Sequence, residues 1–235
     1  MDDSIARSFL SHGAQAQRSH PMRILITSGP TREPLDRVRF ISNRSSGRMG
    51  LALTQAAAAA GHQVTLLSGP VPLPRLTSEG VRSFRFVSTD DLQRLLQEHF
   101  PKCDILIMAA AVADYRSEPA QSGKLRRLDP GEGRTEPLNL QLIPTPDLVA
   151  TVATHKRSTQ KIIAFALEES AQLELRAREK LCRKAVDVIV ANPLETLDSD
   201  HVEAIVLFAD GRRIAPGPLC KSDFATWLVG QLAGL

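Results

Sequence analysis

Short apolar runs alternate with helical stretches along most of the chain. Predicted strands occupy residues 24–27, 63–67, 83–87, 104–108, 138–142, 161–167, 187–191 and 204–209. Predicted helices occupy residues 49–60, 89–99, 168–184 and 222–232, and Pro146 is placed to open another at its first turn. Strands and helices that alternate at this spacing predict βαβ units, and hence a parallel sheet with helices on both faces. The pattern therefore predicts an α/β fold of the Rossmann-like, three-layer α/β/α type with a mostly parallel central sheet.

The pattern also bears on domain organisation. It contains no internal repeat and no interdomain linker, so we expect one domain over residues 22–235. Residues 1–21 lack the apolar core of a secretory signal, and we expect them to be a disordered leader. No apolar run reaches the roughly 18 residues of a membrane span. These features predict a cytoplasmic protein without a membrane partner.

Composition excludes several classes of function. The net charge is +3 and the 29 basic residues are spread along the chain, while aromatic residues make up only 4%. Such a chain offers neither a basic patch nor a stacking platform for nucleic acid. The cysteines, Cys103, Cys182 and Cys220, are far apart and form no CxxC pair, so neither a zinc site nor a disulfide framework is predicted.

The segment from Arg23 to Gly50 has the layout of an anion-binding site. A strand leads into a loop rich in hydrogen-bond donors, and Asn43, Ser45, Ser46 and Gly47 precede the helix predicted at 49–60. A helix amino terminus presents free N–H groups and a positive dipole end to a bound anion. We therefore expect a phosphate to bind here.

Other strand ends carry candidates as well. The small residues 109–114 follow one strand, Phe165 and Glu168 end another, and Asn192 ends a third. Each has a structural explanation by itself, such as a cap or a turn. Because the carboxyl ends of parallel strands meet at one edge of a sheet, their joint occurrence predicts a ligand site there.

Several familiar motifs do not occur. The chain has no GxGxxG, GxxxxGK[ST], GxSxG or HExxH sequence, and its histidines show no metal-ligand spacing. The single tyrosine, Tyr115, is followed at the fourth position by Pro119 rather than lysine. An NAD(P) oxidoreductase is therefore disfavoured.

Seven runs of residues, in this order, resemble bacterial phosphopantothenoylcysteine synthetase. They are TSGPTREPLDRVRFISNRSSGRMG, LLSGPVPLP, MAAAVADYR with the following GKLRR, PTPDLV, FALEE, REKLCRK and DVIVAN. The resemblance spans about residues 22–232, and ISNRSSGRMG and AAAVADYR are its most specific motifs. Because the chain contains no counterpart of the flavin-dependent decarboxylase half, the resemblance implies a stand-alone synthetase with no flavin.

The family's reaction joins L-cysteine to 4′-phosphopantothenate. CTP first converts the carboxylate to an acyl-cytidylate and releases pyrophosphate, and the cysteine amine then displaces CMP. A carboxylate and a triphosphate repel each other, so the resemblance implies Mg²⁺ and nearby cations. It also implies a homodimer whose partner contributes to the active site.

The resemblance assigns roles residue by residue. Asn43 and Lys124 are the implied catalytic residues, and Asn43 with Ser45, Ser46 and Gly47 would hold the substrate's phosphate and acyl parts. The implied nucleotide-binding residues are Ala109, Ala110, Asp114, Lys124, Pro146, Asp147, Leu148, Val149, Phe165, Lys180 and Lys184. No metal ligand is assigned. Residues 115–136, which contain Lys124, are expected to form a mobile flap over the nucleotide.

Three departures from the family pattern keep alternatives open. Arg126 and Arg127 replace lysines after Lys124, Leu167 is bulkier than usual near the base, and Pro193 replaces an aspartate after Asn192. The alternatives are a ligase of the same kind that uses ATP, and a nucleotide-binding protein of the same fold that has lost catalysis.

Overall fold

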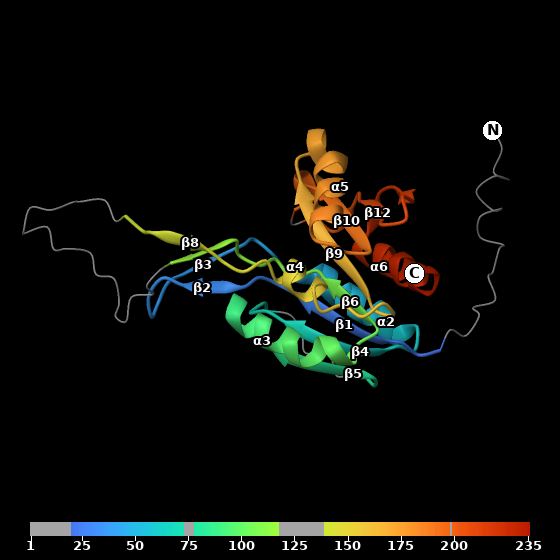
Figure 1. Cartoon of the computed structure of the whole chain (residues 1–235), viewed down its shortest axis with the longest axis horizontal. Coiled ribbons are helices and arrows are strands. Elements are labelled where there is room, and N and C mark those ends of the chain that lie inside the picture. The colour runs from blue at the N-terminus through green and yellow to red at the C-terminus, as the bar shows by residue number, and fades with distance from the viewer. Residues whose placement is uncertain (1–19, 73–77, 118–138, 198) are drawn as a thin grey trace, which may run out of the picture.

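The computed structural model describes residues 20–72, 78–117, 139–197 and 199–235. Its centre is an eight-stranded sheet with the order β13-β12-β10-β9-β6-β1-β4-β5 (Figure 1). The strands are β1 (Arg23–Ser28), β4 (Gln63–Ser68), β5 (Val81–Arg85), β6 (Ile105–Met108), β9 (Lys161–Glu168), β10 (Val188–Pro193), β12 (Ile205–Phe208) and β13 (Arg213–Ile214). The pairings from β10 to β5 are parallel, and only β12 and β13 join antiparallel. The predicted mostly parallel sheet is confirmed.

The strand order reverses direction at the centre of the sheet. From β1 the chain moves outward through β4 to β5, then returns to the other side of β1 and continues through β6, β9 and β10. In such doubly wound sheets the crevice at the reversal, beyond the carboxyl ends of the strands, is where ligands bind. Here that crevice lies between the ends of β1 and β6.

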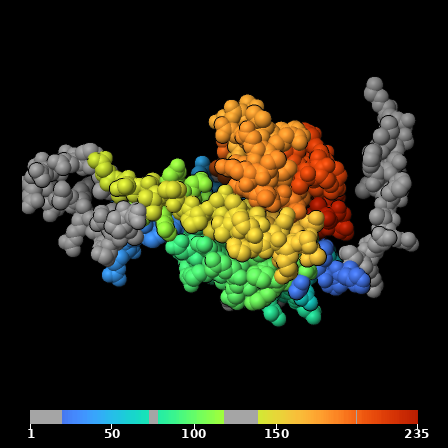
Figure 2. All heavy atoms as spheres, viewed as in Figure 1, coloured from blue at the N-terminus to red at the C-terminus, as the bar shows by residue number. Residues whose placement is uncertain are grey.

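Helices cover both faces of the sheet, so the predicted three layers are confirmed. They are α2 (Arg48–Ala59), α3 (Thr89–His99), α4 (Leu148–Ala153), α5 (Leu173–Arg183) and α6 (Lys221–Gln231). Leu53 of α2 and Phe224 of α6 are buried in one apolar core, whereas Leu96 of α3, Leu148 of α4 and Leu181 of α5 are buried in the other. In Figure 2 the residues after about 160, coloured orange to red, form a lobe beside the rest of the molecule.

Two antiparallel ribbons extend from the crevice, and the hydrophobic pattern predicted only one of their four strands. They are the pair β2 (Arg32–Pro34) with β3 (Phe40–Ser42), and the pair β7 (Tyr115–Ser117) with β8 (Leu142–Pro144). β2 lies against β7, and together the ribbons form the arm that points away from the sheet in Figure 1. A third short ribbon pairs β11 (His201–Val202) with β14 (Leu219–Cys220).

Several predicted boundaries are wrong, and the strand predicted at 83–87 runs from Val81 to Arg85. The strand predicted at 138–142 is β8, which begins at Leu142, where the ladder with Ser117 begins. The helix predicted from Glu168 begins at Leu173, because β9 stays paired with β10 through Glu168. α4 begins at Leu148 rather than at Pro146, since the Asp147 side chain caps it by accepting a hydrogen bond from the Ala150 N–H at 3.1 Å.

Within the described ranges, no helix combines the length and the apolar character needed to cross a membrane.

Candidate functional site

Two adjoining cavities lie at the carboxyl ends of the central strands. The larger has a volume of about 650 Å³ and the smaller about 170 Å³. Residues that line both are Arg44, Ala109, Ala111, Phe165, Leu167, Asn192 and Leu197. The two cavities are therefore parts of one cleft, and it lies at the reversal of the strand order, where the fold predicts a ligand.

The loop after β6 forms the floor of this cleft, and buried threonines fix its position. Thr27 Oγ1 accepts a hydrogen bond from the Ala110 N–H at 3.1 Å, and Thr31 Oγ1 accepts one from the Ala113 N–H at 2.9 Å. The Ala111 N–H donates to the Gly29 carbonyl at 3.0 Å. The loop's small side chains leave its backbone open to a ligand, while hydroxyls from the β1 side hold it rigid.

The larger cavity brings together the residues to which the resemblance assigned the nucleotide. Those that line it are Ala109, Ala110, Asp114, Pro146, Asp147, Leu148, Val149, Phe165, Lys180 and Lys184. Asn43 lines it too, and its amide donates to the Val112 carbonyl at 2.9 Å, which ties the end of β3 to the β6 loop. Lys124 and residues 118–136 of the predicted flap lie outside the described residues, so their placement stays a prediction.

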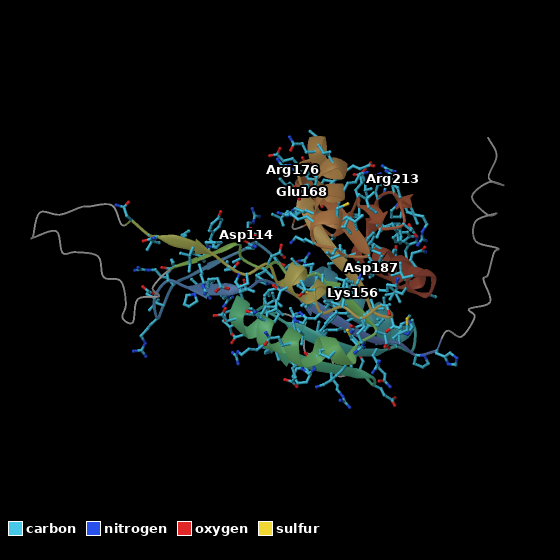
Figure 3. The ribbon with its side chains drawn as sticks, viewed as in Figure 1. Asp114, Lys156, Glu168, Arg176, Asp187 and Arg213 are labelled. Atoms are coloured by element: carbon cyan, nitrogen blue, oxygen red, sulfur yellow. The ribbon has the colours of Figure 1, made fainter. Side chains whose placement is uncertain are left out.

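Two lysines in the larger cavity are each paired with a carboxylate. Lys180 contacts the buried Glu168, and Lys184 lies 3.0 Å from Asp147. Partial burial raises the pKa of Asp147, but hydrogen bonds from the Ala150 N–H and the Lys184 ammonium outweigh this, so the pKa of Asp147 lies below its usual value and its carboxylate is ionised at neutral pH. Figure 3 shows Glu168 beside α5 and Asp114 at the base of the arm.

The smaller cavity contains the predicted phosphate-binding residues Ser45, Ser46 and Gly47. Gly47 begins α2 in the left-handed region, at φ 71°, and its carbonyl accepts a hydrogen bond from Ser28 Oγ at 2.9 Å. No side chain caps α2 and its first turn holds no acidic residue. At Gly50 a Cβ would lie 2.3 Å from the Ser28 Cβ, so only glycine lets the helix start this close to β1.

Some residues of the cleft received no role from the sequence. The sequence marks Glu168 and Asn192 only as strand ends. The buried Asn192 Oδ1 accepts no hydrogen bond from the described residues, although Asn192 lines both cavities. His201 and Lys221 line the smaller cavity from the third ribbon and the start of α6, which lie 154 and 174 residues beyond Gly47. No spacing signal links segments so far apart.

No group of three or more His, Cys, Asp or Glu side chains suited to a metal ion occurs in the part of the chain that the structure describes. The carboxylate of Asp114 is exposed at the cleft. One carboxylate together with substrate phosphates is a usual set of ligands for Mg²⁺.

The fold and the cleft define a Rossmann-like α/β domain with a two-part ligand site at the reversal of its strand order. The chain belongs to the family described as the DNA/pantothenate metabolism flavoprotein C-terminal domain, whose model matches residues 20–235.

Two relatives and one solved structure illustrate this membership. A prokaryotic protein of unknown organism named cysteine/cysteine sulfinic acid decarboxylase is 43% identical over 74% of this chain and 46% of its own length. The coenzyme A biosynthesis bifunctional protein CoaBC of Escherichia coli K12 is 38% identical over 83% of this chain and 48% of its own. The crystal structure of a CoaBC C-terminal domain is 33% identical, covers 90% of this chain and 93% of that one, and superposes with a TM-score of 0.74. The chain thus spans about half the length of the two relatives.

Proposed function

We propose that the protein is a phosphopantothenate–cysteine ligase of coenzyme A biosynthesis, acting in the cytoplasm with CTP as its nucleotide. The observation that carries this proposal is the convergence of separate segments on one cleft. Segments that are far apart in the sequence all line the larger cavity. They are Asn43, the loop after β6, the start of α4, Phe165 and the lysines Lys180 and Lys184. The family membership and the match to a CoaBC C-terminal domain support the same reaction.

The reaction divides into two displacements. In the first, a carboxylate oxygen of 4′-phosphopantothenate attacks the α-phosphorus of CTP, and the bond from that phosphorus to pyrophosphate breaks. In the second, the amine nitrogen of L-cysteine attacks the acyl carbon, a C–N bond forms, CMP leaves, and the amine releases a proton. No protein nucleophile is needed, so catalysis rests on positioning the reactants and offsetting charge.

The cleft offers groups for both tasks. Lys180 and Lys184 lie where they would face the nucleotide's phosphates, and Lys124 is proposed to add a third cation during acyl transfer. Asn43 lies at the junction of the β3 end and the β6 loop, where it would hold the acyl group between the two displacements. Mg²⁺ would enter with CTP and offset the charge of its phosphates, with Asp114 as the nearest proposed carboxylate.

We also propose that the protein is a homodimer joined through the arm. The two ribbons expose large apolar side chains: Val38 is 61% exposed, Phe40 47%, Tyr115 54% and Leu142 42%. Exposed apolar groups gathered on a projecting arm mark an interaction surface. The arm begins at the cleft, so a partner bound there would lie beside the active site.

The experiment that tests the ligase measures pyrophosphate release from 4′-phosphopantothenate and Mg²⁺ with CTP or ATP, each with and without cysteine. We expect release with CTP and cysteine-dependent formation of CMP. Pyrophosphate release with ATP but not with CTP would support the ligase reaction and contradict CTP as its nucleotide. The absence of release with either nucleotide would contradict the ligase and favour a binding protein of this fold.

A further inference from the structure

The smaller cavity differs from the larger one in the charge of its lining. Arg44, Arg48, Lys221 and His201 line it, and no Asp or Glu does so among the described residues. Arg48 lies 2.5 Å from Asp200, but both side chains are more than half exposed, so water and salt screen that pair. The described lining therefore brings four basic side chains together, which suits an anion.

Hydrogen-bond donors join these basic side chains on one side of the cavity. The uncapped amino terminus of α2 faces it together with Ser45 and Ser46. A helix of 12 residues directs its positive dipole end and its first N–H groups toward whatever binds there. These groups form one wall of the cavity, and they belong to the segment in which the sequence predicted an anion-binding site.

A second wall comes from the carboxyl-terminal part of the chain. The third ribbon pairs His201 with Cys220, and α6 begins at the next residue, Lys221, so the two side chains come from neighbouring positions. The Lys221 ammonium donates to the Ser199 carbonyl, and Ser199 Oγ accepts from the His201 N–H at 3.0 Å. The Ser199 turn thus holds the Lys221 ammonium and the His201 backbone, and both residues line the cavity from the carboxyl-terminal part of the chain.

We propose that His201 and Lys221 bind the terminal phosphate of the acid substrate and make the enzyme select the phosphorylated acid over the unphosphorylated one. This inference rests on the proposed function. A cavity of about 170 Å³ holds one phosphate and its neighbouring carbons, whereas a nucleoside triphosphate requires the larger cavity of about 650 Å³. Lys221 contributes a fixed positive charge, and the His201 ring contributes at least one N–H donor in either protonation state.

The test compares the full-length wild type with His201→Ala, Lys221→Met and Lys221→Arg. For Lys221→Met we expect the KM for 4′-phosphopantothenate to rise at least tenfold, and for His201→Ala about threefold to fivefold, with kcat changed less than twofold. Lys221→Arg should restore most of the affinity. The KM for CTP and the kcat/KM for unphosphorylated pantothenate should stay within twofold of the wild type. Lys102→Met removes an exposed lysine at the other end of the sheet and serves as the matched control.

Three outcomes would overturn the inference. The first is an unchanged KM for 4′-phosphopantothenate in both His201→Ala and Lys221→Met. The second is a rise in the KM for CTP alone, which would assign the smaller cavity to the nucleotide. The third is an equal loss with the phosphorylated and unphosphorylated acids. The His201 side chain bonds to no other described residue, so His201→Ala keeps the test valid if Lys221→Met fails to fold.

Calorimetric titration with 4′-phosphopantothenate separates this inference from the proposed function. A wild type that binds the acid, with weaker binding by both variants, but releases no pyrophosphate would refute the ligase and keep the phosphate site. If the wild type releases pyrophosphate normally and both variants bind 4′-phosphopantothenate as tightly as the wild type, the ligase is kept and the phosphate site is refuted.

Discussion

In the larger cavity both described lysines have carboxylate partners, Lys180 with Glu168 and Lys184 with Asp147. In the smaller cavity the described lining has four basic residues and no carboxylate. A paired lysine keeps its position without a ligand, and a bound phosphate must compete with the carboxylate for it. The smaller cavity's basic residues have partners too, such as Arg48 with the exposed Asp200 and Lys221 with the Ser199 carbonyl, but the described lining itself contributes no carboxylate that a phosphate would have to displace. In the proposed reaction the first arrangement would suit pyrophosphate, which leaves, and the second would suit a phosphate that stays bound through both displacements.

The largest expected effect comes from closing the smaller cavity at its base. Gly50→Ala would place a Cβ 2.3 Å from the Ser28 Cβ and 3.0 Å from its Cα, so α2 would have to move away from β1. We expect the free energy of unfolding to fall by about 3 kcal/mol, together with a strong rise in the KM for 4′-phosphopantothenate. Urea denaturation and steady-state kinetics measure the two effects.

Gly230→Ala is the matched control, since a Cβ there has no neighbour within 4 Å and the position is inside α6. It should raise stability by about 0.5 kcal/mol through helix propensity. Equal stability changes in the two variants would show that the close contact between Gly50 and Ser28 is not what positions α2.

The second prediction separates the two roles of Lys180 in the larger cavity. Lys180→Met leaves Glu168 buried without its cation, and we expect the free energy of unfolding to fall by about 2 kcal/mol. Adding Glu168→Gln should recover most of that loss, because the uncompensated charge is gone. The KM for CTP should rise about tenfold in both the single and the double variant. Recovery of CTP affinity in the double variant would contradict a direct role for Lys180.

The smallest effect is expected at Asp147. Its pKa lies below the usual 3.8, so its charge stabilises the fold above that pH, and the contribution is lost as the pH falls through the lowered pKa. Asn keeps the cap on α4, so Asp147→Asn removes mainly the pair with Lys184. Because the carboxylate is partly exposed, we expect a loss of about 0.5 kcal/mol at pH 7, shrinking below pH 3.8. A stability difference between Asp147→Asn and the wild type that grows as the pH falls would contradict this account of the pair.

Sequence reasoning predicted the parts of the fold that depend on local patterns. The apolar runs of β1, β6 and β9 and the alanine-rich α2 were recognisable because their burial imposes periodicity. Of the arm only β8 was predicted, with wrong bounds; β2, β3 and β7 are each three residues long and partly exposed, which leaves no periodic signal. The helix boundary at Leu173 was missed because pairing with β10, a tertiary contact, keeps Glu168 in a strand.

The candidate site, like the fold, could be predicted from the sequence only in part. The residues that the resemblance assigned to the nucleotide belong to continuous motifs, and those that the structure describes all line the larger cavity. The partners of those residues were harder to predict. Glu168 acquires its role from Lys180 on a different element, and His201 reaches the cleft only through its ribbon with β14. Such roles arise from tertiary placement, which one sequence does not reveal.

The most direct test of the two-part cleft is a crystal structure of the protein with 4′-phosphopantothenate and a non-hydrolysable CTP analogue. The account predicts the acid's phosphate among Ser45, Ser46, Gly47, His201 and Lys221, and the nucleotide among Asp114, Phe165, Lys180 and Lys184. Nucleotide phosphates in the smaller cavity, with the acid's phosphate elsewhere, would contradict it.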